Sequence, residues 1–351
     1  MRAVISGSGM FVPPRVVRND RLARVMDTSD EWIRVRTGIE ERRYANLDCA
    51  TSDLAVPAAK GAIRDAGLEL ADVEYLILAT MTPDFYFPGS APFVQRKLGL
   101  GHVPCLDIRQ QCAGFIFGLQ LADAVIRSGQ YRRVLVVGAE VHTAFMEWDC
   151  FDILFGESDR EIEPEWYERN TATRDRTVLF GDGAGAVLLT ATDDDQRGLL
   201  DCLLHSNGSE AERLITRAGG SAYRPYFSPA MTASGDAVPM VEGREVYRLA
   251  VRHMPEVTLE LLGRNRLTTD DVDLFIFHQA NLRINEGVAK RLGLPDDKVF
   301  NNIQRYGNTT AATIPIAFHE ARQQGRVKPG DLVCFVALGS GLNWGAALHR
   351  C

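Results

Sequence analysis

DVEYLILAT (residues 72–80) and DVDLFIFH (residues 271–278) are two versions of one strand, and they decide the fold of this chain. Each is an apolar run of strand length that follows an amphipathic helical pattern and a short polar turn. The two runs lie 199 residues apart. A repeat of this kind predicts that one structural unit occurs twice, so it must be recognised before any fold is assigned.

The repeat continues past these strands. A strand predicted at 103–109 leads into a helix at 112–128, and a strand predicted at 299–304 leads into a helix at 308–324. Both helices end near a glycine, as helices with a C-terminal cap do, and an apolar strand follows each. Strand and helix patterns alternate in both copies, so the sequence predicts two related α/β halves packed around a pseudo-twofold axis.

Three polar residues take related positions in this duplicated pattern. Cys112 and Asn308 begin equivalent helices, while His278 ends the strand that corresponds to the one ending at Thr80. We therefore expect the three to converge on one interface. A thiolate exchanges acyl groups readily with another thioester, and a helix N-terminus helps to stabilise its charge. The combination indicates an acyl-thioester site.

Each of the three residues has a plain structural explanation when it is taken alone. Cys112 fits a small core residue, His278 a hydrogen-bonded structural histidine, and Asn308 a helix N-cap. Together they favour a site in which Cys112 is the nucleophile and Asn308 is a neutral donor to an enolate or thioester oxygen. The backbone N–H groups of Ser340 and Gly341, with that of Cys112, are candidates for an oxyanion hole.

Another glycine-rich stretch, FGDGAGA (residues 180–186), superficially resembles a phosphate-binding loop. It lacks both the spacing of the P-loop and that of the dinucleotide-binding fingerprint. We interpret it as a place of close backbone packing.

Composition and charge limit the possible functions. The 351 residues are 46% hydrophobic and 24% charged, which is ordinary for a globular protein, and no apolar run approaches the ~18 residues of a membrane span. A net charge of −7 argues against a nucleic-acid partner. The seven cysteines are scattered without a C-x-x-C pair, so neither disulfides nor a metal site is expected. These features predict a cytoplasmic protein that is not membrane-bound.

The segment 140–176 separates two strand-and-helix regions and is rich in aromatic and acidic residues. It is predicted to be an irregular insertion, either an elaborated loop or a small lid. Loops of this length usually have a function or are mobile.

Six ordered motifs resemble those of the β-ketoacyl-ACP synthase III family, which belongs to the thiolase superfamily. They are DTSDEWI (27–33), RTGI (36–39), CAGF (112–115), LFGDGAGA (179–186), HQANLRI (278–284) and GNT (307–309), and the resemblance runs from Met1 to about Leu348. It implies a thiolase-like α/β fold with a layered α-β-α-β-α architecture. The N-terminal half would be 1–195 and the C-terminal half 196–351.

The same resemblance implies a two-step reaction without a cofactor or metal. Cys112 would accept an acyl primer from coenzyme A (CoA), after which malonyl-ACP would bind, lose carbon dioxide and attack the acyl-enzyme. His278 and Asn308 would stabilise the enolate oxygen during decarboxylation. The product, a β-ketoacyl-ACP, would initiate fatty-acid or related biosynthesis.

Binding residues are implied by the resemblance as well. CoA would be bound by Trp32, Arg36, Arg174 and Asn281. Phe87 would reach across a homodimer and close the acyl pocket of the partner. A basic patch would meet the acidic acyl carrier protein (ACP), and its members are Arg248, Arg283, Lys290 and Arg291.

Two features depart from typical members of the family: the connection 140–176 is longer, and a serine replaces the middle one of three glycines at 339–341. The primer is left open between acetyl, medium-chain, branched and aromatic acyl groups. The main alternative is an acyltransferase that passes the acyl group to an alcohol or amine. Condensation is favoured over it because both donors that decarboxylation needs are present. A non-catalytic scaffold that binds a carrier protein is disfavoured because Cys112 is retained.

Overall fold

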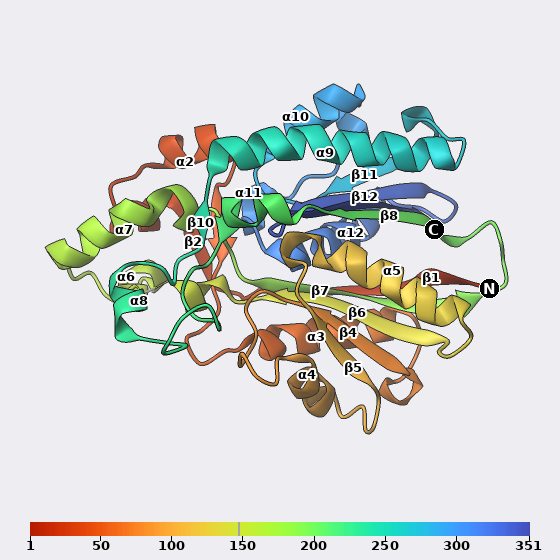
Figure 1. Cartoon of the computed structure of the whole chain (residues 1–351), viewed down its shortest axis with the longest axis horizontal. Coiled ribbons are helices and arrows are strands. Elements are labelled where there is room, and N and C mark those ends of the chain that lie inside the picture. Colours follow the sequence, from red (N-terminus) through yellow and green to blue (C-terminus); the bar gives the residue numbers. More distant parts are fainter. Residues whose placement is uncertain (147) are drawn as a thin grey trace.

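Two mixed β-sheets enclose a central pair of helices in the computed structural model of the chain (Figure 1). The structure describes residues 1–146 and 148–351. The first sheet contains five strands, which are, in spatial order, β1 (Arg2–Phe11), β7 (Gly183–Thr192), β6 (Arg133–Glu140), β4 (Tyr75–Ala79) and β5 (Cys105–Ile108). β4 pairs in parallel with β5 and β6, whereas β7 runs antiparallel to β6 and β1.

The second sheet repeats this order. Its four strands are β8 (Gly198–Ser206), β13 (Asn343–Arg350), β12 (Leu332–Gly339) and β11 (Leu274–Phe277). β11 pairs in parallel with β12, and β13 runs antiparallel to β12 and β8. Strand for strand, β11 takes the place of β4, β12 of β6, β13 of β7 and β8 of β1. The predicted duplication is confirmed, with DVEYLILAT supplying β4 and DVDLFIFH supplying β11.

The central layer consists of α5 (Gly114–Arg127) and α12 (Thr313–Gln323), which lie between the sheets (Figure 1). Phe115 of α5 and Phe318 of α12 contact the same ring, that of Phe335 in β12, with centroids 6.2 and 5.3 Å away. Such shared aromatic contacts join both halves into one hydrophobic core.

The outer layers complete the architecture. α3 (Thr51–Asp65) and α4 (Ala91–Leu98) cover the first sheet, while α9 (Gly243–Arg264) and α10 (Leu282–Leu292) cover the second (Figure 1). α3 approaches β1 closely, because a side-chain carbon added at Gly7 would lie only 2.2 Å from the backbone oxygen of Ala62 in α3. The five layers α-β-α-β-α are those expected from the sequence.

The prediction of a strand at 299–304 is wrong. Only Val299 pairs with β11, and helix α11 (Ile303–Tyr306) follows. The side-chain oxygen of Gln279 accepts a hydrogen bond from the backbone N–H of Asn302 (3.2 Å). A side chain thus satisfies a backbone group that a neighbouring strand would have paired, and the ladder stops.

The segment 140–176 is not irregular as predicted, because it contains two helices, α6 (Phe151–Phe155) and α7 (Pro164–Thr177). Three of its aromatic residues, Trp148, Phe151 and Phe155, pack in one apolar cluster with α2 (Asp30–Thr37). α7 begins with a proline, which suits the first turn of a helix. Most of its other residues are polar, so no apolar 3.6-residue period predicted the helix.

The remaining elements are short. They are β2 (Val16–Arg18), α1 (Asn19–Ala23), β3 (Glu41–Arg43), β9 (Leu214–Ile215), α8 (Pro229–Ala233) and β10 (Met240–Val241). Residues 193–197 connect β7 to β8, and the expected boundary between the halves lies in this connection. Among the described residues, no helix combines the length and the apolar character that a bilayer span requires.

Candidate active site

A cavity of about 670 Å³ brings the three predicted polar residues together. Cys112, His278 and Asn308 all line it, although they come from different elements of the two halves. Ser340 and Gly341 belong to the same wall. The convergence expected from the duplicated pattern is therefore present in the folded chain.

Cys112 lies in a single 3₁₀ turn, Gln111–Ala113, that leads directly into α5. The residue is only 7% exposed. Burial raises the pKa of its thiol to about 12, and the negative charge of Glu140 adds to the effect, while a backbone hydrogen bond acts in the opposite direction. Cys112 is consequently a thiol at neutral pH.

His278 follows β11 and extends its ladder, because its backbone N–H donates to the carbonyl oxygen of Val336 (2.8 Å). Nδ1 of the ring lies 2.7 Å from the hydroxyl oxygen of Thr313, and that hydroxyl lies 2.9 Å from the carbonyl oxygen of Thr310. Nε2 is buried and has no hydrogen-bond partner among the described residues. Burial lowers the pKa of the ring to about 3, so His278 is neutral.

The Thr313 hydroxyl sets the tautomer of this ring, because it carries one proton and faces two acceptors. When it donates to the Thr310 carbonyl, His278 carries its proton on Nδ1 and offers a lone pair at Nε2. When it turns toward Nδ1, the His278 proton resides on Nε2 and can be donated into the cavity. The two orientations of this hydroxyl thus match the two tautomers of the ring, and passing from one to the other requires loss of the Nδ1 proton and gain of a proton at Nε2.

Asn308 precedes the short turn Thr310–Ala312, which leads into α12. Its side-chain oxygen accepts a hydrogen bond from the backbone N–H of Thr310 (2.8 Å). The oxygen therefore bonds the backbone two residues further on, while the amide nitrogen remains for the cavity that Asn308 lines. The N-cap of the turn is Thr309, so Asn308 is not the helix N-cap, and its donor role stays a prediction.

The end of β12 lies directly against the turn that holds Cys112. A side-chain carbon added at Gly339 would lie 2.9 Å from the backbone nitrogens of both Cys112 and Ala113. The Ser340 hydroxyl donates to the carbonyl oxygen of Leu214, so its side chain is held by β9. This proximity agrees with an oxyanion hole built from backbone N–H groups on both sides of the cavity.

Glu140 is a buried carboxylate beside this site that sequence reasoning did not single out. It accepts hydrogen bonds from the hydroxyls of Thr80 (3.1 Å) and Thr82 (2.7 Å) and from the backbone N–H of Met81 (3.1 Å). Burial raises its pKa to about 7. Met81 and Thr82 line the cavity, so Glu140 holds part of its wall. The available signal was an acidic residue ending an apolar strand.

The four residues predicted to bind CoA form one connected group. The guanidinium carbons of Arg36 and Arg174 lie 4.3 and 5.1 Å from the ring centroid of Trp32. Arg174 also pairs with Asp27 (2.6 Å). Asn281 lines the cavity and donates from its side chain to the carbonyl oxygen of Arg36 (3.1 Å). An aromatic ring with two cations therefore lies next to one end of the cavity.

Phe87 is not part of this chain's own cavity wall. Its side chain is 90% exposed, in a loop before α4, and the preceding residues Phe85 and Tyr86 are 58% and 57% exposed. Three consecutive exposed aromatic side chains are typical of a contact surface. The expected role toward a partner subunit agrees with this placement.

The basic patch predicted on α9 and α10 is a surface of mixed charge. Arg248 pairs with Glu245 (2.8 Å), and Arg283 pairs with Glu286 (2.8 Å). Arg291 lies 3.8 Å from Glu256. Lys290 is exposed, and the described part of the chain gives it no ion pair.

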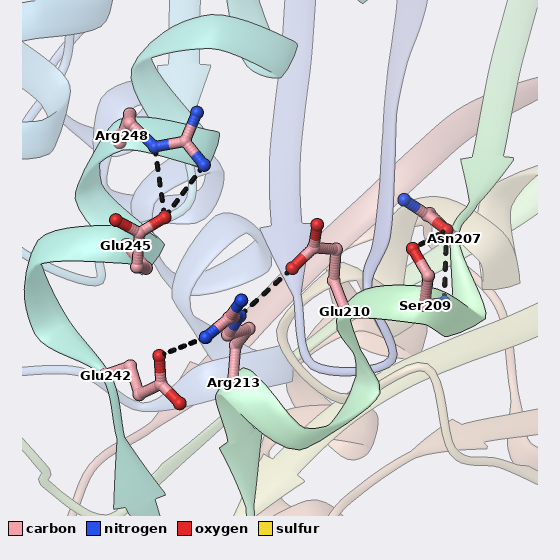
Figure 2. A network of polar contacts seen from close by, with 7 residues as sticks. All are labelled: Asn207, Ser209, Glu210, Arg213, Glu242, Glu245 and Arg248. Atoms are coloured by element: carbon pink, nitrogen blue, oxygen red, sulfur yellow. Dashed lines mark hydrogen bonds and ion pairs between the residues drawn. The ribbon is translucent and has the colours of Figure 1, made fainter.

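A polar network next to this surface borders the cavity (Figure 2). Arg213 bonds to Glu210 (3.1 Å) and to Glu242 (2.6 Å), which stands just before α9. Figure 2 also shows the neighbouring pair of Arg248 and Glu245 on the first turns of α9. The network ties residues 210–213 to the start of α9, and cavity-lining residues lie in both places.

Comparisons with known proteins agree on one family. A family model described as 3-oxoacyl-[acyl-carrier-protein (ACP)] synthase III matches residues 106–158 and 163–208, and the model of its C-terminal part matches residues 262–351. The interruption at 159–162 falls between α6 and α7. The chain is similar to proteins named beta-ketoacyl-[acyl-carrier-protein] synthase III. The Roseiflexus castenholzii protein is 43% identical (99% of this chain, 98% of that one), and the Rickettsia bellii protein is 39% identical over both full lengths.

Solved structures give the same result. The crystal structure of 3-oxoacyl-[acyl-carrier-protein] synthase III from Aquifex aeolicus is 40% identical, with a TM-score of 0.84 and coverage of 99% of this chain and 100% of that one. The priming β-ketosynthase from the R1128 polyketide biosynthetic pathway is 28% identical, with a TM-score of 0.83 and coverage of 99% and 96%.

Proposed function

The chain belongs to the 3-oxoacyl-[acyl-carrier-protein] synthase III family, and on that premise we propose how its residues carry out the reaction. It is a condensing acyltransferase that joins an acyl group from acyl-CoA to malonyl-ACP in fatty acid biosynthesis. The observation that carries the residue assignment is the convergence of Cys112, His278 and Asn308 on one cavity.

In the priming step, the sulfur of Cys112 attacks the thioester carbonyl of acyl-CoA. The thiol must lose its proton, because its raised pKa keeps it protonated at neutral pH. With its own proton on Nδ1, His278 offers the Nε2 lone pair to that proton and passes it to the departing CoA sulfur. The acyl group then stands on Cys112, and free CoA leaves.

In the condensation step, malonyl-ACP loses carbon dioxide, and the electron pair of the broken carbon–carbon bond becomes an enolate. For this step His278 is in its other tautomer, having given up the Nδ1 proton and taken one at Nε2. Its Nε2–H and the amide of Asn308 donate to the enolate oxygen. Neutral donors suit this task, because the charge develops only in the transition state. The enolate carbon attacks the acyl carbonyl, whose oxyanion is held by backbone N–H groups of Cys112, Ser340 and Gly341. Collapse of this intermediate releases Cys112 and the β-ketoacyl-ACP.

Substrate and partner contacts belong to the same proposal. Trp32, Arg36, Arg174 and Asn281 bind CoA, for which stacking on Trp32 and the two cations suit an adenine and its phosphates. Phe87 closes the acyl pocket of a second subunit in a homodimer. ACP docks on the surface of α9 and α10 that carries Arg248, Arg283, Lys290 and Arg291.

We assign the chain to the cytoplasm on chemical grounds. All seven cysteines are free thiols in the described residues, which fits a reducing compartment. Transfer of the acyl group to an alcohol or amine is not favoured, because such transfer has no use for two donors aimed at an enolate oxygen.

Intact-mass spectrometry tests the assignment. The protein is incubated separately with acetyl-, octanoyl- and benzoyl-CoA and is then chased with malonyl-ACP. The expected result is an acyl adduct that is absent in Cys112→Ser and is discharged as a β-ketoacyl-ACP. The most reactive primer identifies the primer class. An adduct that survives the chase would point to a different acyl acceptor.

A further inference from the structure

The backbone of Asn308 is held by a stretch to which the reaction assigns no role. The stretch is 179–183, the centre of the glycine-rich motif. The N–H of Asn308 donates to the carbonyl oxygen of Leu179 (2.8 Å), and the N–H of Gly181 donates to the carbonyl oxygen of Asn308 (3.2 Å). Both backbone polar groups of Asn308 are thus bonded to this stretch, which sets the position of its side chain.

Asp182 fixes the stretch to its surroundings. The carboxylate is fully buried, and it accepts hydrogen bonds from the backbone N–H groups of His142 (2.7 Å), Thr143 (3.2 Å) and Ala45 (2.8 Å). It also accepts from the hydroxyl of Thr143 (2.8 Å). The three backbone groups can only donate, and an ionised carboxylate, which accepts on both oxygens, satisfies all four bonds together.

Two further contacts, both from His142, hold the residues of the 179–183 stretch that lie beside Asn308. Nδ1–H of His142 donates to the carbonyl oxygen of Gly181 (2.8 Å), and the His142 ring stacks on Phe180 with centroids 4.6 Å apart. A side-chain carbon at Gly181 would lie 2.2 Å from the carbonyl oxygen of Tyr306. Only glycine therefore permits the close approach that the pairing with Asn308 requires.

We propose that Asp182 is a positioning residue for condensation: it anchors the 179–183 stretch, which in turn holds Asn308 where its amide meets the enolate oxygen. The inference rests on the proposed role of Asn308. Cys112 is carried by a different element, the turn before α5. A mutation of Asp182 should therefore slow the condensation step and leave the rate of the priming step unchanged.

The test separates the two half-reactions in Asp182→Asn. This change keeps the size of the side chain but sets an N–H group against donors. Acylation of Cys112 is followed by intact mass, and discharge of preformed acyl-enzyme by malonyl-ACP is followed in single turnover. We expect priming within about twofold of the parent and condensation slower by about tenfold to a hundredfold, as displacements near 1 Å cause. Asp65→Asn is the matched control: Asp65 accepts the N–H of Ser8 and pairs with Arg322, and it should leave both steps unchanged.

A double mutant tests the route of the effect. If Asp182 acts through Asn308, Asp182→Asn combined with Asn308→Ala should condense no more slowly than Asn308→Ala alone. Losses that multiply, or equal losses in both half-reactions, would overturn the inference. Thr143→Val, which removes a single bond to Asp182, gives the same readout in a milder form if Asp182→Asn does not fold. If Asn308→Ala alone condenses at the parental rate, the proposed function of Asn308 fails instead.

Discussion

At the scale of single residues, Glu140 and Cys112 affect each other through charge. Glu140 is one cause of the raised pKa of Cys112, because a nearby negative charge disfavours the thiolate. The carboxylate is nevertheless needed by the turn that it holds at Thr80 and Thr82. Burial and the charge of Glu140 together keep the nucleophile protonated, and in the proposed priming step it gives its proton to Nε2 of His278.

Glu140→Gln should lower the pKa of Cys112, because it removes the negative charge but keeps an oxygen that accepts hydrogen bonds. At pH 8 we expect Cys112 to be alkylated by iodoacetamide faster than in the parent, by up to about tenfold, the factor that one pKa unit produces. The rate is measured at Cys112 by peptide mapping. Cys334, which is buried with no charged group contributing to its pKa shift, is the internal control. Unchanged or slower labelling of Cys112 would show that the charge of Glu140 does not control the thiol.

Thr313→Val should impair condensation, because the mutant lacks the hydroxyl that positions the His278 proton. We expect discharge of preformed acyl-enzyme by malonyl-ACP to slow by about tenfold or more, within the range for a misplaced acid–base group. Thr313→Ser retains the hydroxyl and should restore most of the rate. Equal rates in the valine and serine variants would exclude the tautomer role.

The residues that the sequence could predict are those that stand at the ends of regular elements. Cys112, His278 and Asn308 each follow or begin a strand or helix with a clear hydrophobic period in the sequence. The duplicated pattern therefore places them in one interface. Asp182 could not be found in this way. The donors to Asp182 lie at residues 45 and 142–143, and no spacing in the sequence indicates that these positions meet.

At the scale of elements, α7 brings a charged side chain to α2. Arg174→Ala should weaken binding of acyl-CoA, because it removes one of the two guanidinium groups over Trp32. We expect the KM for acyl-CoA to rise about threefold to tenfold with little change in kcat, the sign of lost uniform binding. Stability should change little, because the Asp27 carboxylate of this pair is 72% exposed and water screens its attraction to Arg174. Arg160→Ala breaks a comparable ion pair with Asp152 in the same segment and should leave KM unchanged. A fall in kcat at constant KM would contradict the CoA assignment.

Elements with a clear apolar period were predictable, and those stabilised by polar or tertiary contacts were not. The strands β4, β6, β11 and β12 and the central helices α5 and α12 were found because their buried faces are apolar. Helix α7 was missed because its apolar residues are few. The stretch 299–304 has the composition of a strand, but the Gln279 side chain ends the ladder after Val299.

At the scale of the whole molecule, His349 makes stability depend on pH. In β13, its Nε2 accepts a hydrogen bond from the backbone N–H of Ile5 in β1 (3.0 Å), so it joins the two sheets. Burial lowers the pKa of His349 to about 3, well below its unfolded value. Stability from the neutral ring is fully present above about pH 6.5 and is lost as the pH falls toward 3.

His349→Gln should reduce this loss, because glutamine can accept the bond from Ile5 and does not titrate. Between pH 7.5 and 5 the free energy of unfolding should fall by about 2 kcal/mol less in the variant than in the parent, from 1.36 kcal/mol per pKa unit. Urea unfolding at both pH values measures the difference. An identical fall in both proteins would mean that His349 is not neutral in the folded state.

The strand pairing also shows how two copies of one unit came to differ. Tyr75 pairs with Val134 in the first sheet, and Leu274 pairs with Val333 in the second, so the register equates Glu140 with Gly339. In one copy the position carries a carboxylate that fills its surroundings. In the other it carries no side chain, and the backbone nitrogen of Cys112 occupies the space that a side chain would take. Two identical halves could not form this centre, because the same position must carry a carboxylate in one half and no side chain in the other.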